Sequence, residues 1–429
     1  MHTPAIQLAK LLSSTTRRFN LGNGSTWPGH LMLKHNPHFL REVFAKNPIP
    51  IVLIAGTNGK TTVSKLLRHI LEVEGKIVLH NESGANLASG IASSLLLNMT
   101  STGKLRADYA ILEVDENALP VILSEITPAY LVILNLFRDQ LDRYGEVDAV
   151  ANHWGQGISK LTASTTIILN ADDPQVAFFA TNTKAKTVYF GLEGKKSHAI
   201  EHASDSAFCP RCGHKLTYNS NTFSHLGDWH CDSCHFNRPK LTLAEASVYP
   251  LSGTYNKYNT IAAVLAADRT GVPKQTIQKA LHSFSPAFGR QEELLYQGVK
   301  VKMFLSKNPT GLNESLRTVA ELQGKSLLLA LNDGYADGTD VSWIWDVDFE
   351  DFLPQFGRLT LTGDRTYDLA LRVFYAMDRN AVSFLPVPDI QDALQRAVLK
   401  IGKDEVLYIL PTYTAMLALR KIITGKKIL

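Results

Sequence analysis

The segment Ile51-Val-Leu-Ile-Ala-Gly-Thr-Asn-Gly-Lys-Thr-Thr62 joins an apolar, β-branched run to a glycine loop and then to a helix-compatible stretch. The apolar run predicts a short buried strand, and the glycines permit backbone dihedrals that aim consecutive N–H groups at one anion. A helix from Thr61 to about Glu74 would direct its N-terminal dipole at the same anion. This order indicates a phosphate-binding loop rather than a turn with a chance Gly-Lys-Thr. We expect the nucleotide to contact Gly56, Thr57, Asn58, Gly59, Lys60, Thr61 and Thr62.

The composition indicates a globular protein with more than one domain. At 429 residues the chain exceeds what one hydrophobic core usually serves, so two or three domains are expected. The net charge of +4 is small for this length and gives no support for nucleic acid as the main partner. Because no apolar run is long enough to span a bilayer and no signal-peptide pattern is present, we expect a cytoplasmic protein that is not an integral membrane protein. Apolar spacing predicts helices over 5–18 and 30–44, with a loop at 22–29.

The phosphate loop has three residues between Gly56 and Lys60, fewer than the usual spacing. In this form it resembles the loop of the Mur ligase and folylpolyglutamate synthetase superfamily. The resemblance implies that ATP activates a carboxylate as an acyl phosphate, which an amine then attacks. The region before the loop is too short for the UDP-sugar-binding domain that precedes the ATPase in Mur ligases acting on soluble nucleotide precursors. The resemblance therefore implies a different form of substrate.

A second buried run, over residues 108–117, ends in carboxylates. In an α/β sheet, ligands gather at the carboxyl ends of strands, and carboxylates there are suited to holding Mg²⁺ opposite the phosphate loop. Glu113 matches the metal-binding glutamate of the family, and Asp115 and Glu116 are secondary candidates. Lys60 is expected to reach the terminal phosphates of ATP, and the hydroxyl of Thr61 is expected to bind Mg²⁺.

Two further strand ends follow the family pattern, with one departure. Residues 130–136 form an apolar run followed by Phe137-Arg-Asp-Gln-Leu-Asp-Arg-Tyr-Gly145, where Mur ligases carry Asp-His-Leu-Asp. Gln140 stands in place of the histidine, which leaves a metal or phosphate contact at that position open. In the Asn-Ala-Asp-Asp-Pro loop at 170–174, the aspartates are expected to organise a turn. The positions that match are Asn135, Asp139, Leu141, Asp142, Gly145, Asp172 and Asp173.

Two Cys-x-x-Cys pairs, separated by 18 residues, interrupt the α/β pattern at residues 205–240. Their spacing fits a tetrahedral zinc ribbon in which four thiolates complete the coordination shell. A complete shell indicates a structural zinc ion that stabilises an insert too small to form its own core. The expected ligands are Cys209, Cys212, Cys231 and Cys234.

The α/β pattern then returns with two more motifs of the family. Gly-x-x-Asn-x-x-Asn begins a helix, and it places Asn256 and Asn259 on one helix face. Their amides could hydrogen-bond nucleotide or metal-bound water, although N-terminal capping is an equal alternative for Asn256. The following Gly-Arg-x-Glu motif supplies Arg290. By resemblance, Arg290 meets the nucleotide phosphates and would neutralise charge during phosphoryl transfer.

The last part of the chain departs from amino-acid-adding Mur ligases. Lys307-Asn-Pro-Thr-Gly311 stands where those enzymes carry Asp-Tyr-Ala-His-x-Pro, which argues against a standard amino-acid ligase. Residues 326–349 then crowd aspartates and two tryptophans around one strand end, which favours a partner surface or site over a solvated acidic loop. Asp364 and Arg365 occupy the position of the family's Asp-Asn-Pro-Arg and would face substrate.

These features together resemble the MurT family, the ligase subunits of lipid II isoglutaminyl synthase, over essentially the whole chain. The resemblance implies a GatD-like glutamine amidotransferase partner, in a heterodimer or larger complex. It also implies lipid II as substrate, at the inner face of the membrane, to which the chain would be peripheral. The partner is supported independently, because glutaminases of this kind use a cysteine nucleophile and all four cysteines here are committed to zinc. The family further implies an aspartate that completes the partner's Cys-His site, with Asp340 as first choice and Asp346 as second.

The sequence thus predicts an α/β protein with a doubly wound parallel sheet, a Cys₄ zinc-ribbon insert and a smaller C-terminal α/β domain. The expected domains are an N-terminal helical segment at 1–45, an ATPase domain at 46–295 with its insert at 205–240, and a ligase domain at 296–429. Two alternatives remain: an amino-acid ligase of the Mur or folylpolyglutamate type, and a nucleic-acid-binding ATPase that reads through the ribbon.

Overall fold

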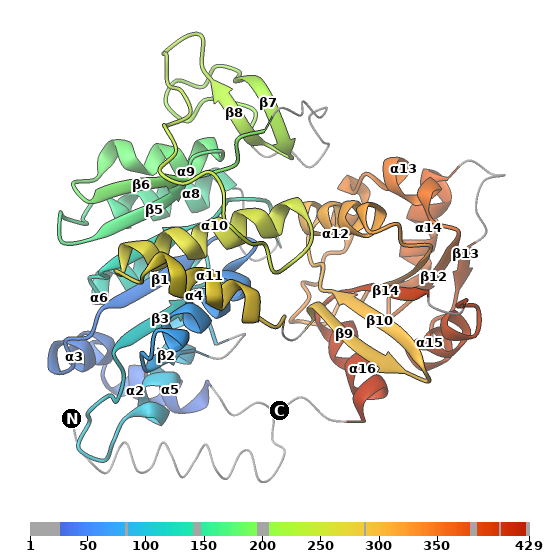
Figure 1. The fold of residues 1–429 in the computed structure, drawn as a ribbon, viewed down its shortest axis with the longest axis horizontal. Coiled ribbons are helices and arrows are strands. Elements are labelled where there is room, and N and C mark those ends of the chain that lie inside the picture. The colour runs from blue at the N-terminus through green and yellow to red at the C-terminus, as the bar shows by residue number, and fades with distance from the viewer. Residues whose placement is uncertain are drawn as a thin grey trace.

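The structure is a computed structural model that describes residues 26–81, 85–139, 147–194, 206–286, 289–377, 384–402 and 405–425. Two α/β units lie next to each other along the long axis, the first drawn from blue to yellow and the second from orange to red (Figure 1). Each unit is built on a six-stranded sheet. A small hairpin lobe projects from the first unit. The helix expected over 5–18 lies outside the described residues.

The first sheet is parallel throughout and has the strand order β2-β3-β1-β4-β5-β6. Its central strand β1 has β3 on one side and β4 on the other, so the order of connection reverses at β1. In doubly wound sheets, ligands bind at the carboxyl ends of the strands beside such a reversal. The strands are β1 (Ile51–Ala55), β2 (Val78–His80), β3 (Tyr109–Glu113), β4 (Tyr130–Ile133), β5 (Thr166–Asn170) and β6 (Lys186–Phe190).

Helices cover both faces of this sheet, which explains why all five residues of β1 are buried. Alternate residues of β1 enter two separate cores: Leu53 packs in one, whereas Val52 and Ile54 pack in the other. The first core also receives α2 (Trp27–His35), α3 (Phe39–Lys46), α5 (Ala88–Asn98), α6 (Leu119–Glu125), α8 (Val147–Ile158), α9 (Pro174–Phe178) and η1 (Phe179–Asn182). The second receives α4 (Lys60–Val73), α10 (Thr254–Arg269) and α11 (Lys274–Ser283).

The second unit has the strand order β13-β12-β11-β14-β10-β9 and is parallel except where β9 pairs with β10. Its strands are β9 (Arg290–Tyr296), β10 (Val299–Phe304), β11 (Ser326–Ala330), β12 (Arg358–Thr362), β13 (Phe384–Pro386) and β14 (Val406–Pro411). Its helices are α12 (Pro309–Glu321), η2 (Ser342–Asp346), α13 (Phe349–Phe352), η3 (Leu353–Gln355), α14 (Thr366–Ala376), α15 (Ile390–Leu399) and α16 (Tyr413–Thr424). Because β9 belongs to this second sheet, we propose that the ligase domain begins at Arg290. The predicted α/β class with two units is confirmed.

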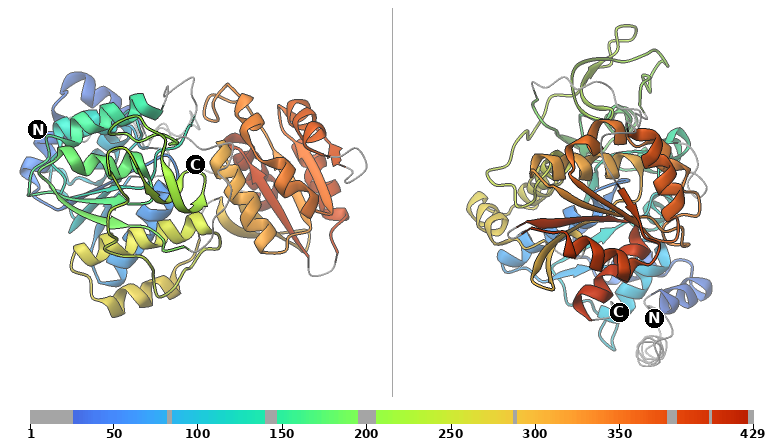
Figure 2. Two further views of the ribbon diagram at one scale, coloured as in Figure 1. Left: turned by 90° about the horizontal axis from the view of Figure 1, so that it is seen from above. Right: turned by 90° about the vertical axis from the view of Figure 1, so that its right-hand side faces the viewer.

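The cysteine-rich insert forms an antiparallel hairpin of β7 (Thr217–Phe223) and β8 (Leu226–His230) over a small core of its own. In the right-hand view of Figure 2 the insert lies at the top of the molecule, and Phe223 and Leu226 of its hairpin pack in the second core of the first unit. Asp172 joins the insert to the first sheet: its carboxylate accepts hydrogen bonds from Arg238 Nε at 2.7 Å and from Tyr258 Oη at 2.6 Å. The next residue, Asp173, caps α9 by accepting hydrogen bonds from two backbone N–H groups. Both aspartates therefore organise the loop after β5.

The N-terminal prediction was wrong in detail. The expected loop at 22–29 overlaps α2, which begins at Trp27 and carries Pro28 in its first turn, where proline is tolerated. The helix expected over 30–44 is instead two helices, because Pro37 disfavours the helical conformation of Asn36. Among the described residues, no helix has both the length and the apolar character needed to cross a membrane.

Replacement of Asp172 by alanine should destabilise the protein by about 3–5 kcal/mol, because it leaves the largely buried guanidinium of Arg238 without its carboxylate. Urea unfolding measures the change. Asp268→Ala is the matched control, because Asp268 pairs with Arg269 at the surface, where such a pair contributes about 0–1 kcal/mol. Equal losses in the two variants would contradict the role assigned to Asp172.

Candidate active site

The phosphate loop connects β1 to α4 and is shaped by two glycines with positive φ, Gly56 at 145° and Gly59 at 95°. Both dihedrals lie in the region that side chains disfavour. A Cβ atom on Gly59 would lie 2.1 Å from Asn259 Oδ1 on α10, so this glycine is also required by close packing. The loop delivers Lys60 and Thr61 to the first turn of α4.

The loop is fastened to the chain that follows β4. Asn58 N donates to Asn135 Oδ1 at 2.9 Å, and Asn135 Nδ2 donates back to Asn58 O at 3.0 Å. The hydroxyl of Thr57 donates to Phe137 O and accepts from Phe137 N. These reciprocal bonds hold the loop backbone in one conformation before any ligand is bound.

A buried carboxylate lies beside the start of α4. Glu113, at the end of β3, is 2% exposed and accepts hydrogen bonds from Thr61 Oγ1 at 2.8 Å and Ser64 Oγ at 2.6 Å. His80 Nε2, at the end of β2, lies 3.3 Å from the same carboxylate. Burial would raise the pKa of Glu113, but the hydrogen bonds and the charge of His80 outweigh burial and lower it. Glu113 is therefore ionised at neutral pH, as a magnesium ligand must be.

Arg290 brings the second unit into this cluster. The side chain extends from β9, and its Nη2 atom donates to Thr61 Oγ1 at 3.2 Å. The hydroxyl of Thr61 therefore lies between the carboxylate of Glu113 and the guanidinium of Arg290. Hard oxygen donors and a nearby fixed cation suit a magnesium–phosphate group, so the residues fit the expected ligand.

A second group of charges lies on the other side of the loop. Lys60 Nζ donates to Glu116 Oε1 at 3.0 Å and to the carbonyl oxygens of the loop, and Lys307 of the second unit pairs with Asp139. Burial raises the pKa of Glu116 against the opposing charges of Lys60 and Lys307. The four side chains bring two cations and two carboxylates close together, beside the position expected for the phosphates.

A cavity opens between the loop and the second unit, and it contains the two predicted asparagines of α10. Asn259 Nδ2 donates to Asn256 Oδ1 at 3.1 Å, and Asn256 Nδ2 donates to Ser252 O at 2.8 Å; no side chain caps the start of α10, so the capping alternative for Asn256 was wrong. Across the cavity, Asn58 and Asn308 exchange hydrogen bonds between the two units. The cavity therefore has amide groups around its entrance and Tyr255, Tyr258, Phe137, Phe223 and Phe304 among its lining residues.

The four cysteines come together in the insert, with all four Sγ atoms within 4.8 Å of one another. Cys209 and Cys234 are 3.6 Å apart, and Cys212 and Cys231 are 3.5 Å apart. Ligands about 2.3 Å from a tetrahedral zinc ion have separations of this size, so the cluster is compatible with zinc.

The two aspartates expected to serve a partner lie at η2: Asp346 is its last residue, and Asp340 precedes its first residue by two positions. Asp340 is exposed, and its carboxylate accepts from Ser342 N at 2.8 Å, which lowers its pKa. Asp346 lies 3.4 Å from Arg138 of the first unit. Arg365 pairs with Asp333 and Asp368, and Asp364 N donates to Asn332. Gln140, Leu141, Asp142 and Gly145 lie outside the described residues.

Four contributors to the site were missed by the sequence analysis: Ser64, His80, Lys307 and Asn308. Ser64 follows Thr61 by three residues on α4, so helical spacing could have identified it. His80 ends a strand adjacent to β3, but only the observed strand order makes that neighbour apparent. Lys307 and Asn308 depend on the packing of two units, which no local pattern encodes.

Replacement of Gly59 by alanine should weaken ATP binding at least tenfold, because the new methyl group displaces Asn259 and strains the loop. Gly75→Ala is the matched control: Gly75 also has a positive φ, 81°, but has no atom within 4 Å of the added carbon. Gly75→Ala should lose about 1 kcal/mol of stability and Gly59→Ala more than that, and only Gly59→Ala should change nucleotide affinity measured by calorimetry. Unchanged affinity in Gly59→Ala would contradict this account of the loop.

Comparisons with known proteins agree with this geometry. Residues 54–267 match the Mur ligase middle domain, and residues 305–416 match the MurT ligase C-terminal domain. A pseudomurein peptide ligase type C from Methanothermus fervidus has a similar fold, with a TM-score of 0.65 at 22% identity, covering 88% of this chain and 79% of that one.

Two curated relatives are similar over most of their length. The subunit MurT of lipid II isoglutaminyl synthase (glutamine-hydrolyzing) from Staphylococcus aureus strain COL is 34% identical, covering 86% of each chain. Its counterpart from Streptococcus pneumoniae strain ATCC BAA-255 / R6 is also 34% identical, covering 95% of this chain and 94% of that one. With this identity over nearly the whole length, and with both halves matching their family models, the chain belongs to the MurT family of Mur ligase-like proteins.

Proposed function

We propose that this chain is the ATP-dependent ligase subunit of a lipid II isoglutaminyl synthase. It would convert the α-carboxylate of D-glutamate in the stem peptide of lipid II to the carboxamide of D-isoglutamine. The cluster of Thr61, Glu113 and Arg290 carries the proposal, because it combines a phosphate loop, a metal-binding carboxylate and a phosphate-binding cation. The names of the two curated relatives support the substrate.

The phosphate loop and the start of α4 would bind ATP. Backbone N–H groups of the loop and the helix dipole attract the phosphates, and Lys60 would exchange its contact with Glu116 for the terminal phosphates. Thr61 and Glu113 would hold Mg²⁺, which supplies positive charge to the β- and γ-phosphates when bound. The amides of Asn256 and Asn259 beside the loop would hydrogen-bond the nucleotide.

The reaction would proceed in two displacements. An oxygen of the glutamyl carboxylate attacks the γ-phosphorus, ADP leaves, and an acyl phosphate forms. Arg290 would stabilise the charge on the transferring group. The nitrogen of ammonia then attacks the acyl carbon, phosphate leaves, and the nitrogen loses a proton to give the carboxamide. The zinc would stabilise the insert and take no part in either displacement.

Ammonia would come from a separate GatD-like glutaminase that docks on the second unit. Helix α14 supports this assignment, because four large side chains at helical spacing leave an apolar face exposed: Tyr367 at 70%, Leu371 at 51%, Phe374 at 48% and Tyr375 at 68%. Trp345 of η2 extends the face by packing against Tyr375 with ring centroids 5.9 Å apart. We call these five residues the aromatic face. Exposed aromatic side chains in one patch are typical of the centre of a protein interface.

An aspartate beside the aromatic face would complete the partner's Cys-His site. Asp346 is the last residue of η2 and directly follows Trp345, and Asp340 precedes the first residue of η2 by two positions. Asp340 remains the first choice because it is exposed and ionised, whereas Asp346 pairs with Arg138. Peripheral association with the inner face of the membrane would follow from the lipid anchor of the substrate.

Lys60→Ala should reduce amidation of lipid II, measured by mass spectrometry with ATP, Mg²⁺ and ammonium chloride, by at least 10³-fold, because the terminal phosphates lose their cation. Circular dichroism and zinc content should be unchanged. Lys76→Ala, a charge-matched control in the exposed turn after α4, should keep full activity. Retained amidation in Lys60→Ala would refute the assignment of the phosphate loop, and incorporation of an amino acid instead of ammonia would indicate an ordinary ligase.

Leu371→Asp should reduce glutamine-dependent amidation at least tenfold in the presence of the glutaminase, because a carboxylate in the aromatic face opposes docking. Turnover with free ammonia should be unchanged. Leu399→Asp on α15 is the matched control, since Leu399 is 82% exposed and lies outside the aromatic face. The docking assignment fails if both variants respond alike, or if Leu371→Asp loses both activities equally.

A further inference from the structure

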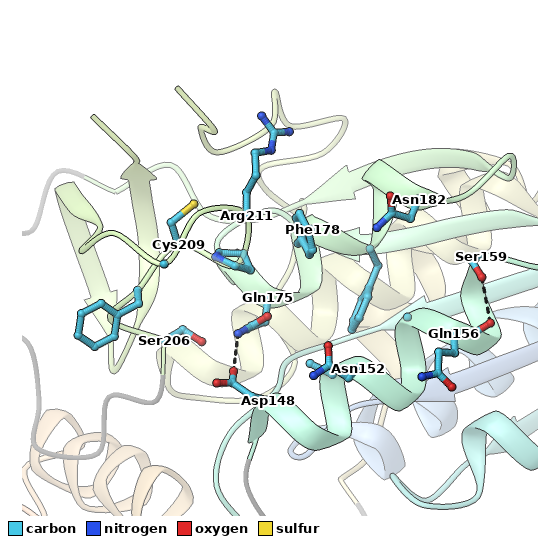
Figure 3. A pocket seen from close by; sticks show the side chains of 16 residues that line it. Asp148, Asn152, Gln156, Ser159, Gln175, Phe178, Asn182, Ser206, Cys209 and Arg211 are labelled. Carbon is cyan, nitrogen blue, oxygen red and sulfur yellow. Dashed lines mark hydrogen bonds between the residues drawn. The ribbon is translucent and has the colours of Figure 1, made fainter. Parts of the chain in front are cut away.

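A large cleft lies beside the zinc-binding insert, separate from the phosphate loop (Figure 3). Its volume is about 860 Å³, within the range of ligand sites. Helix α8 forms one wall, and the α9–η1 segment forms the second. The third wall is the loop at 206–213, which contains the first two cysteines of the insert.

Uncharged amides dominate the polar lining of this cleft. Asn152 and Gln156 extend into it from α8, and Gln175 and Asn182 border it from the α9–η1 segment. The carboxylate of Asp148 is engaged, because Gln175 Nε2 donates to it at 2.8 Å.

Aromatic side chains line the same cleft. Phe178 faces it and packs edge-on against Phe236 of the insert, and Phe208 is 61% exposed at its margin. Arg211 lies over the ring of Phe236 at 4.5 Å, so the guanidinium stacks on the aromatic group rather than standing alone. The cleft therefore offers amide donors, amide acceptors and apolar ring surface with little net charge.

This lining suits a neutral ligand rich in hydroxyl and acetamido groups. Each amide can donate and accept at once, which matches a hydroxyl or an N-acetyl group, and aromatic surfaces pack against the C–H faces of a sugar ring. A phosphate would require several cations, and nucleic acid would require a basic track. An N-acetyl amino sugar meets the chemistry of the cleft best.

Helix α8 connects the cleft to the reaction centre. On its inner side, Val147 and Val150 line a small cavity together with Glu116 and Asp139. Trp154 Nε1 donates to Glu116 O at 2.8 Å, which fixes α8 to the loop that carries this carboxylate. The cleft lies on the outer side of the same helix, so the two sites are separated by about one helix diameter, roughly 10 Å.

We propose that the cleft binds the N-acetyl amino sugars of the muramoyl peptide, while the stem peptide passes the N-terminal end of α8 to the reaction centre. This rests on the proposed function. In a muramoyl peptide, a lactyl group and one alanine separate the sugar from the glutamyl residue. Counted together with the glutamyl residue itself, these units span at most about 10 Å, which is about the thickness of α8. The insert would thus form part of the substrate site.

Calorimetric titration of the full chain with two soluble probes tests the proposal: a GlcNAc–MurNAc-pentapeptide without lipid, and the same pentapeptide without sugar. The wild-type chain should bind the sugar-bearing probe at least tenfold more tightly. Asn152→Ala/Gln156→Ala should abolish this difference, because two amide contacts with the sugar are lost. His153→Ala is the matched control, since His153 is an exposed neighbour on α8 outside the cleft. Asn152→Trp, which fills the cleft, should have the same effect as the double variant.

Three results would overturn the proposal: equal affinity of the wild-type chain for both probes, an unchanged difference in the double variant, or a double variant that loses affinity for the sugar-free peptide as well. The last result would show that the cleft binds peptide. Amidation of lipid II with ammonia is assayed separately. Sugar-dependent binding without amidation would refute the proposed reaction and leave the site, whereas amidation without sugar-dependent binding would refute only the site.

Discussion

The hydroxyl of Thr61 lies between a buried carboxylate of one unit and a guanidinium of the other, and the candidate active site depends on that arrangement. Glu113 and Arg290 are each costly to bury without a partner of opposite charge. The positive charge of Arg290 offsets the negative charge of Glu113. Because Arg290 lies on β9 of the second sheet, this interaction also fixes the position of one sheet relative to the other. Asn58 with Asn308, and Asp139 with Lys307, cross the same boundary. The contacts that order the units are therefore the contacts that a magnesium–nucleotide group would meet.

The insert shows how a short segment is held without a large core. Its buried residues form a cluster of only a few side chains, including Trp229 and two of the cysteines, so a metal ion would supply stability that burial does not. The attachment of the insert to the first sheet also depends on few residues. Trp229 Nε1 donates to Ala171 O, and Arg238 pairs with Asp172, so two adjacent residues after β5 hold the hairpin against the sheet. The walls of the cleft beside α8 depend on this attachment.

The sequence revealed what local patterns encode. The strand, loop and helix around Lys60 follow from residue order, and the four cysteines follow from their spacing, since both signals lie within short windows. Contacts that join distant segments were not accessible in this way. His80 reaches Glu113 only because β2 is adjacent to β3, and Lys307 reaches Asp139 only because the two units pack against each other. The helix predicted over 30–44 is two helices, because Pro37 ends the first one although the apolar pattern continues past it.

The position of η2 bears on how ammonia would reach the acyl phosphate. Asp346 at the end of η2 contacts Arg138, and the next residue, Asp139, pairs with Lys307 at the reaction centre. The adjacent residues Arg138 and Asp139 therefore connect the surface proposed for the partner to the Lys307 pair through their two side chains. A glutaminase docked on the aromatic face would then release ammonia close to its point of use. A short path matters because ammonia that escapes to water is protonated at neutral pH and loses its nucleophilic electron pair. In this geometry the aspartates beside η2 could take part in the partner's chemistry. The ligase would keep its fold without the partner.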